Sequence, residues 1–173
     1  MIFLTVGTQL PFDRLTAAMA AVAPRLDDEV VAQIGSGGAE RPEFACHRHL
    51  DPEAFDRLFA DAKVVVAHAG MGTILTARRL GKPLVVMPRR YDLGEHRNDH
   101  QVATAARLGH LIGVEVVNGE DDLFAALNRP HVQAPADRHG PQRDRLALRL
   151  KSFIEAQPDG ARQLQRTKLW AQK

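Results

Sequence analysis

Short β-branched runs alternate with helix-length segments along most of this chain, and that alternation constrains the fold most strongly. The runs IFLTV and LVVM are examples, and each is followed by a segment with helical patterning. Strands that alternate with helices are joined by right-handed crossovers and therefore run parallel. We expect an α/β fold with a doubly wound parallel sheet. The expected strands are 2–6, 29–34, 44–47, 63–67, 84–87 and 112–117, and the expected helices are 12–23, 51–61, 73–80, 98–108 and 120–128.

Length and cysteine content indicate the broad class of protein. A chain of 173 residues suits one domain. It begins on a strand without a basic leader, it holds a single cysteine, Cys46, and no apolar run approaches the ~18 residues of a membrane helix. We therefore expect a cytoplasmic protein without disulfides.

Positive charge is concentrated at the carboxyl-terminal end. Residues 138–173 carry nine Lys or Arg and three acidic residues, a balance of +6, whereas the whole chain carries +2. A nucleic-acid binder would spread basic residues over the fold, commonly with stacking aromatics, so we expect no nucleic-acid partner. A partner protein or an anionic membrane surface suits the basic end better.

Two segments make up this basic end. Between residues 141 and 157, helical spacing places Leu146, Leu150, Phe153 and Ile154 in one apolar stripe, which packs either on the domain's own sheet or on a partner. Residues 158–173 form a basic tail in which cations alternate with Leu164, Leu169 and Trp170. Trp is a frequent anchor at protein and membrane interfaces. We therefore expect a domain over residues 1–157 and a separate tail.

A glycine-containing turn follows the expected strand 63–67. The sequence AHAGMGTI leads directly into a helical segment that Gly81 and Pro83 close. A helix start presents unpaired N–H groups and partial positive charge, so this turn suits an anion. It matches neither a P-loop nor a dinucleotide fingerprint, in which a third glycine would replace Leu75. A plain strand-to-helix turn remains the alternative.

Other polar loops fall at the same edge of the expected sheet. Ligands of such sheets bind beyond the carboxyl ends of the strands. The segments 7–11 and 88–98 both lie there, and the glycine-rich segment 35–38 reads either as a further ligand loop or as a flexible linker.

The long polar segment PRRYDLGEHRNDHQ leads into the expected helix 98–108. Asn98 or Asp99 can cap that helix, which leaves His100 and Gln101 in its first turn beside the glycine turn. These side chains suit sugar hydroxyls, and the glycine turn suits phosphate. A phosphorylated sugar satisfies both.

Four side chains each have more than one interpretation. His96 and His100 are four residues apart, as in some metal sites, but His96 precedes the helix, so we expect no metal. Glu95 is either a solvated loop carboxylate or an acceptor for sugar hydroxyls. His68 is either a satisfied buried imidazole or a ligand of the phosphate.

The sequence resembles the donor-binding, carboxyl-terminal half of MurG-type glycosyltransferases. It is most similar to the stand-alone soluble subunits of split glycosyltransferases. These include the PssE and EpsF type of bacterial exopolysaccharide synthesis and the soluble subunit of the dolichol-linked N-acetylglucosaminyltransferase. The resemblance spans residues 2–109 and rests on FLTVGT, FDRL, AHAGMGTI, LGKPLVVMPR and GEHRNDHQ.

This resemblance implies a single Rossmann-like half-domain of the GT-B fold that binds a UDP-sugar without a metal or other cofactor. The turn 68–73 would hold the diphosphate, the segment 95–101 would meet the sugar, and uridine would lie toward the loops after the second and third strands. The family pattern places a ribose-binding Glu where this chain has Thr76, which leaves the ribose contact without charge assistance. The expected donor-binding residues are Gly7, Thr8, His68, Gly70, Met71, Gly72, Thr73, Thr76, Glu95, Asn98, His100 and Gln101.

In two-domain members the catalytic base and the acceptor site belong to the amino-terminal half, and no complete active site can be assembled from this chain. The resemblance therefore implies the UDP-sugar-binding subunit of an inverting, two-component glycosyltransferase. A membrane-associated partner would supply the catalytic residues and recruit the chain to the inner face of the membrane. The acceptor would be lipid-linked, in exopolysaccharide or glycan biosynthesis. A non-catalytic nucleotide-sugar-binding or structural subunit and a sugar-nucleotide epimerase-like domain are the alternatives.

Overall fold

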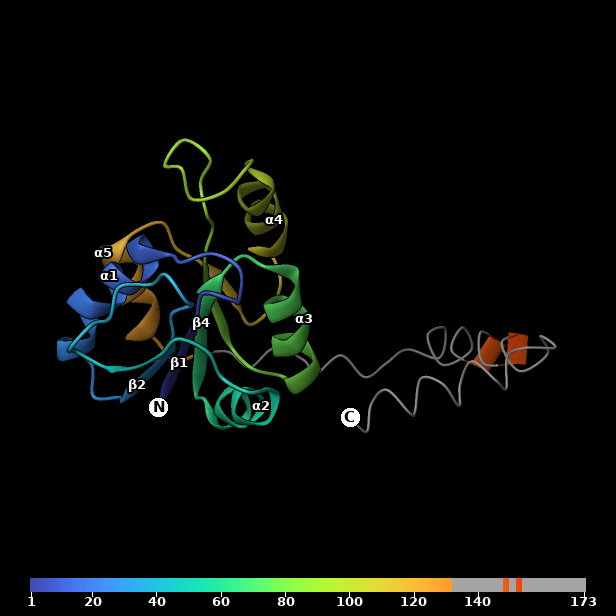
Figure 1. Cartoon of the computed structure of the whole chain (residues 1–173), viewed down its shortest axis with the longest axis horizontal. Coiled ribbons are helices and arrows are strands. Elements are labelled where there is room, and N and C mark those ends of the chain that lie inside the picture. Colours follow the sequence, from blue (N-terminus) through green and yellow to red (C-terminus); the bar gives the residue numbers. More distant parts are fainter. Residues whose placement is uncertain (132–147, 150–151, 154–173) are drawn as a thin grey trace. The chain divides into compact units, whose positions relative to one another are not determined.

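A computed structural model describes residues 1–131, 148–149 and 152–153. Within these residues, six parallel strands form one sheet in the order β3-β2-β1-β4-β5-β6 (Figure 1). The predicted doubly wound α/β sheet is confirmed, and the strand order reverses direction between β1 and β4. The strands are β1 (Ile2–Thr5), β2 (Val30–Gln33), β3 (Ala45–His47), β4 (Val64–His68), β5 (Leu84–Met87) and β6 (Val114–Val116).

Helices cover both faces of this sheet, because successive residues of a strand point to opposite sides. Ile2 and Leu4 pack in a core with α1 and α5, whereas Phe3 packs in a second core with α2, α3 and α4. Figure 1 shows the two groups of helices on opposite sides of the strands. The helices are α1 (Asp13–Val22), the 3-10 turn η1 (Ala23–Arg25), α2 (Pro52–Asp61), α3 (Met71–Leu80), α4 (His100–Leu108) and α5 (Glu120–Leu127).

The three central strands end at the same level. Thr5 lies opposite Gln33 of β2 and Ala67 of β4 in the parallel register. The buried Thr5 hydroxyl donates to Gln33 Oε1 at 2.9 Å and accepts from Gly7 N at 3.2 Å. These bonds fix the start of the loop after β1 against the end of β2.

Two helices begin two residues away from their predicted positions. Helix α3 begins at Met71, two residues early, because the Gly70 carbonyl already accepts the Ile74 N–H at 3.1 Å. Helix α4 begins at His100 rather than residue 98. Asp99 is its N-cap residue, but the Asp99 carboxylate accepts from Tyr91 N, at 2.9 Å, instead of capping the helix. The glycine turn is therefore shorter than the sequence suggests.

The chain divides into two compact units, Met1–Ala136 and Asp137–Lys173. In the second unit, residues 148–149 and 152–153 are helical. The remaining residues of the predicted apolar stripe (Leu146, Leu150 and Ile154), the predicted boundary after residue 157 and the basic tail 158–173 lie outside the described residues. None of the helices that the structure describes is long and apolar enough to cross a membrane.

Candidate functional site

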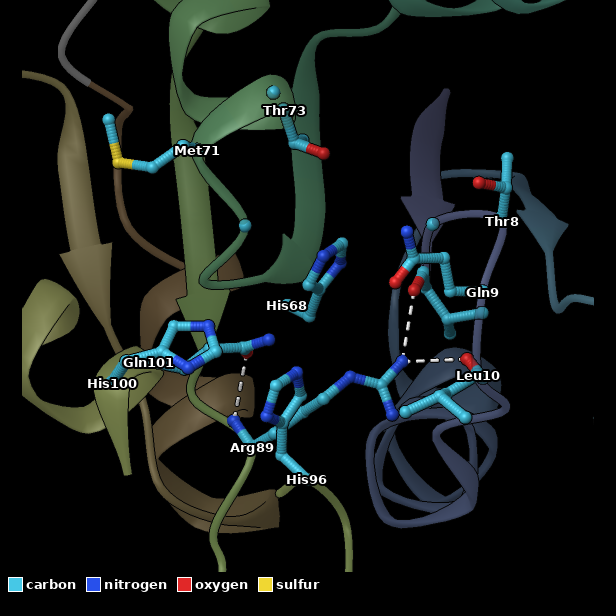
Figure 2. Close-up of a pocket in the computed structure, with 14 residues that line it drawn as sticks. Thr8, Gln9, Leu10, His68, Met71, Thr73, Arg89, His96, His100 and Gln101 are labelled. Carbon is cyan, nitrogen blue, oxygen red and sulfur yellow. Dashed lines mark hydrogen bonds between the residues drawn. The ribbon is translucent and has the colours of Figure 1, made fainter. Parts of the chain in front are cut away.

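An open cavity of ≈ 370 Å³ lies beyond the carboxyl ends of β1, β4 and β5 (Figure 2). It stands where the strand order reverses direction, and the first turns of α3 and α4 form part of its wall. That is the usual ligand position in a doubly wound sheet. Its lining residues are Val6, Gly7, Thr8, Gln9, Leu10, His68, Gly70, Met71, Gly72, Thr73, Arg89, His96, His100 and Gln101.

The amino-terminal end of α3 supplies backbone donors to this cavity. The first hydrogen bond within the helix uses the Ile74 N–H, so the amides of Met71, Gly72 and Thr73 precede the helical hydrogen-bond ladder. All three residues line the cavity. Unpaired amides together with the positive end of the helix dipole make this wall a site for an anion.

His68 stands between two glycines at the end of β4. A Cβ atom on Gly7 would lie 2.8 Å from Cε1 of the imidazole, and one on Gly70 would overlap the same ring. Gly7 also has a φ of +79°, which disfavours other residues. Both glycines are therefore needed where they stand, because they make room for the ring.

The His68 imidazole is neutral at neutral pH. Burial, followed by the positive charge of Arg89, lowers the pKa of His68 to about 4. Among the described residues, the buried Nδ1 has no hydrogen-bond partner. A neutral ring in this position offers a ligand one N–H donor rather than a charge.

Arg89 is the cation of the cavity, and sequence reasoning missed it. Its side chain, 2% exposed, reaches across the cavity from the end of β5 to the loop after β1 (Figure 2). The guanidinium donates to the carbonyl oxygens of Pro11, Val6 and Leu10 at 2.6, 3.0 and 2.7 Å. It also lies 4.5 Å from the centroid of the Phe12 ring. The sequence feature that could have identified Arg89 is its place directly after the buried run LVVM and Pro88, at the carboxyl end of a strand.

Burial lowers the pKa of Arg89, although the charge of Glu95 opposes that effect. Within residues 1–131, no carboxylate forms an ion pair with this guanidinium. Carbonyl dipoles therefore hold a buried positive charge that lacks a counter-ion. A ligand anion in the cavity would provide one.

The start of α4 and the loop before it place three polar side chains on the cavity wall. Gln101 is 4% exposed, and its Oε1 accepts from Arg89 N at 3.2 Å. His96 and His100 pack edge to face with ring centroids 4.4 Å apart, and His100 Nδ1 contacts Asn98 Oδ1. Burial, followed by the neighbouring His100, lowers the pKa of His96. Among the described residues, no three His, Cys, Asp or Glu side chains gather as metal ligands would.

Glu95 and Asn98 do not line the cavity. The Glu95 carboxylate instead accepts from Arg14 Nε at 2.7 Å and from Arg90 N at 2.9 Å. Burial alone would raise the pKa of Glu95, but these hydrogen bonds hold it below its usual value. Arg14 also donates to Pro88 O at 2.7 Å, so this pair joins α1 to the loop after β5. A direct contact between Glu95 and a sugar therefore stays a prediction.

A second cavity of ≈ 400 Å³ adjoins the first and includes Thr76. The two cavities share Gly7, Thr8, Gly72 and Thr73, so they meet at the start of α3. Leu50, Pro52 and Phe55 make part of the second cavity apolar, and Gln33 and Asp56 add polar groups. Of the predicted site residues, the two cavities together gather all except Glu95 and Asn98.

One family model matches most of the chain. The family described as glycosyltransferase family 28 C-terminal domain matches residues 1–130. No curated protein sequence matches the chain. Among solved structures, the glycosyltransferase of kitacinnamycin is 25% identical, with a TM-score of 0.56, and the match covers 73% of this chain and 33% of that one.

Two further structures share the fold. The solution structure of ALG13 is 19% identical, with a TM-score of 0.56, over 84% of this chain and 93% of that one. MurG from Acinetobacter baumannii is 19% identical, with a TM-score of 0.53, over 73% of this chain and 38% of that one. The chain spans 33% and 42% of the first two glycosyltransferases it matches, but nearly all of the ALG13 structure.

Replacing Arg89 by Met should remove the donors that hold the loop after β1. Hydrogen bonds from a charged group contribute ~1.5–3 kcal/mol each, so we expect the free energy of unfolding in urea to fall by roughly 3 kcal/mol. Arg89→Lys, which keeps the charge, should cost less. The exposed Arg107 of α4 is the control, and a loss for Arg107→Met as large as for Arg89→Met would contradict the role assigned to Arg89.

The depressed pKa of His68 should make stability depend on pH. An unfolded His protonates near pH ~6.5, whereas folded His68 does so near 4, so the stabilisation is complete above pH ~6.5 and is lost as pH falls toward 4. The loss amounts to on the order of 3 kcal/mol. Urea unfolding from pH 7 to 4.5 should show a shallower pH dependence for His68→Gln than for the parent. The exposed His110→Gln should keep the parental slope; equal slopes in all three proteins would refute the assignment.

Proposed function

This chain belongs to the glycosyltransferase family 28 C-terminal domain family, and we propose that it binds a UDP-sugar as the donor for glycosyl transfer. One observation carries the proposal: two adjoining cavities meet at the start of α3, and a buried cation lines the first of them. A UDP-sugar has the matching order of a nucleoside, a dianionic bridge and a sugar.

The diphosphate would lie against the first turn of α3. Amides of Met71, Gly72 and Thr73 would donate to its oxygens, and neutral His68 would add an N–H. Arg89 would balance its negative charge without leaving the three carbonyls that it already holds. Donors that are fixed before the ligand arrives need little reorganisation. They therefore favour binding of the donor, and they stabilise UDP as the leaving group when its bond to the sugar breaks.

The sugar and the nucleoside would occupy opposite sides of this phosphate site. Gln101 and His100 line the first cavity and would bond sugar hydroxyls. Uridine would occupy the second cavity, whose wall includes Gln33 at the end of β2 and Leu50 after β3. This arrangement supports the expected position of uridine beside the loops after these two strands.

The proposed reaction is a direct displacement with inversion, without a metal or other cofactor. An acceptor hydroxyl would attack the anomeric carbon, the bond between that carbon and the β-phosphate oxygen would break, and UDP would leave. A base outside this chain would take the hydroxyl proton. Within this chain, Arg89 and the α3 amides would stabilise the charge that grows on the departing UDP.

We further propose that a second, membrane-associated glycosyltransferase subunit supplies this base and the lipid-linked acceptor, in exopolysaccharide or glycan biosynthesis. Exposed apolar side chains near the cavity support a protein partner there: Leu10 and Met71 on the cavity wall, and Tyr91 and Leu93 in the loop after β5. The basic tail 158–173 would help to hold the complex at an anionic membrane.

Calorimetry with UDP tests the donor site. A Cβ atom on Gly72 would meet no atom of the chain within 4 Å, so Gly72→Val should fold, yet its side chain would crowd the amides of α3. We expect UDP affinity to fall at least ~10-fold, as loss of one charge-assisted hydrogen bond would produce. Gly119, at the start of α5 and equally free of close neighbours, provides Gly119→Val as the control. Absence of UDP binding by the parent, or unchanged binding by Gly72→Val, would exclude the proposed site.

A charge introduced among the exposed apolar side chains near the cavity tests whether a partner binds there. Leu93→Glu should leave UDP affinity unchanged but should abolish co-purification with a co-expressed acceptor-binding subunit, and transfer activity with it, because a buried unpaired carboxylate is costly. Ile112 is 64% exposed, against 51% for Leu93, and precedes β6 at the opposite end of the sheet. Ile112→Glu should therefore co-purify normally. Full transfer by the isolated parent chain would contradict the two-component proposal.

A further inference from the structure

The second cavity holds one carboxylate, and that carboxylate is not on the helix where the family resemblance places it. Position 76 of α3 is Thr, whereas Asp56 lines the same cavity from the neighbouring helix α2. The other polar groups of this cavity are hydroxyls, an amide and the backbone. Among the described residues that line this cavity, Asp56 is therefore the single anionic acceptor.

The position of Asp56 relative to Thr76 follows from a third side chain. Arg79 NH2 lies 4.0 Å from Asp56 Oδ1. Arg79 and Thr76 are three residues apart on α3, so they occupy the same face of that helix. The Asp56 carboxylate consequently lies beside the face from which a carboxylate at position 76 would project.

The ion pair with Arg79 leaves the Asp56 carboxylate available to a ligand. A separation of 4.0 Å is too long for a hydrogen bond, and the two side chains are 53% and 64% exposed. Exposed pairs of this kind contribute little to stability. Hydroxyl groups of a ligand can therefore replace solvent on the carboxylate without breaking a strong interaction.

We propose that Asp56 takes the place of the missing carboxylate at position 76 and accepts hydrogen bonds from the ribose hydroxyls of the donor nucleotide. This inference rests on the proposed UDP-sugar function and adds to it a specificity-determining residue on a different helix. Two carboxylate oxygens match two neighbouring ribose hydroxyls, and charge assistance strengthens both bonds. Thr76 lies on the same wall and contributes a neutral hydroxyl. The chain therefore selects a ribonucleotide through α2.

Calorimetry with two nucleotides tests this role. UDP and 2′,3′-dideoxy-UDP share the base and the diphosphate, but the second lacks both ribose hydroxyls. We expect Asp56→Asn to weaken UDP at least ~10-fold, the effect of losing a hydrogen bond to a charged group, and to leave the weaker binding of the dideoxy nucleotide unchanged. Asp61→Asn, at the end of the same helix and outside the cavity, should bind both nucleotides as the parent does.

A second variant separates ribose recognition from a general loss of negative charge. Adding Thr76→Glu to Asp56→Asn returns a carboxylate to the same wall from α3, and UDP affinity should return to within a few-fold of the parent. Failure of this rescue, or equal losses for UDP and dideoxy-UDP, would overturn the role of Asp56. If the parent binds UDP and Asp56→Asn binds it equally well, this inference fails and the proposed function stands. If the parent binds neither nucleotide, both fail.

Discussion

The hydrogen bonds from the buried Arg89 guanidinium to three carbonyl groups determine the shape of the candidate site. They join the end of β5 to the loop after β1, segments about 80 residues apart in the chain. A buried cation is costly unless it has hydrogen-bond acceptors, and here three backbone carbonyl groups accept from the guanidinium. The loop therefore keeps one conformation, and the cavity between it and the glycine turn exists because of that conformation. The pair of Arg14 and Glu95 strengthens the same connection from the other side of the loop after β5.

Electrostatic preorganisation follows from this arrangement. The backbone carbonyls hold Arg89 without neutralising its net charge, and the start of α3 adds partial positive charge nearby. His68 stays neutral, because burial and the neighbouring cation both disfavour its protonation. The cavity thus presents one fixed charge and several neutral donors. Such a site attracts a dianion without requiring the fold to bury several like charges.

The order of the elements and the position of the site could be predicted from the sequence, because both depend on local patterns. The β-branched runs specify parallel strands, and AHAGMGTI specifies a helix start at their carboxyl ends. The hydrogen-bond partners of Arg89 could not be predicted, because every residue has a backbone carbonyl group and the sequence does not show which of them will accept. The partner of Glu95 could not be predicted either, because Arg14 lies on α1, far from the polar segment that Glu95 shares with Gln101. Helix α3 begins at Met71 rather than at residue 73, because Gly70 is its N-cap residue. The hydrophobic pattern alone does not determine this boundary.

The packing of His68 between Gly7 and Gly70 also bears on how this sequence can vary. The ring occupies the space that side chains at both positions would need, so these three residues form one volume-matched unit drawn from two separate loops. Replacing Gly70 is compatible with the fold only if residue 68 becomes smaller at the same time, and Gly7 is further restricted by its φ of +79°. Substitutions at these sites are therefore non-additive, and libraries that diversify the site one position at a time will miss the functional combinations.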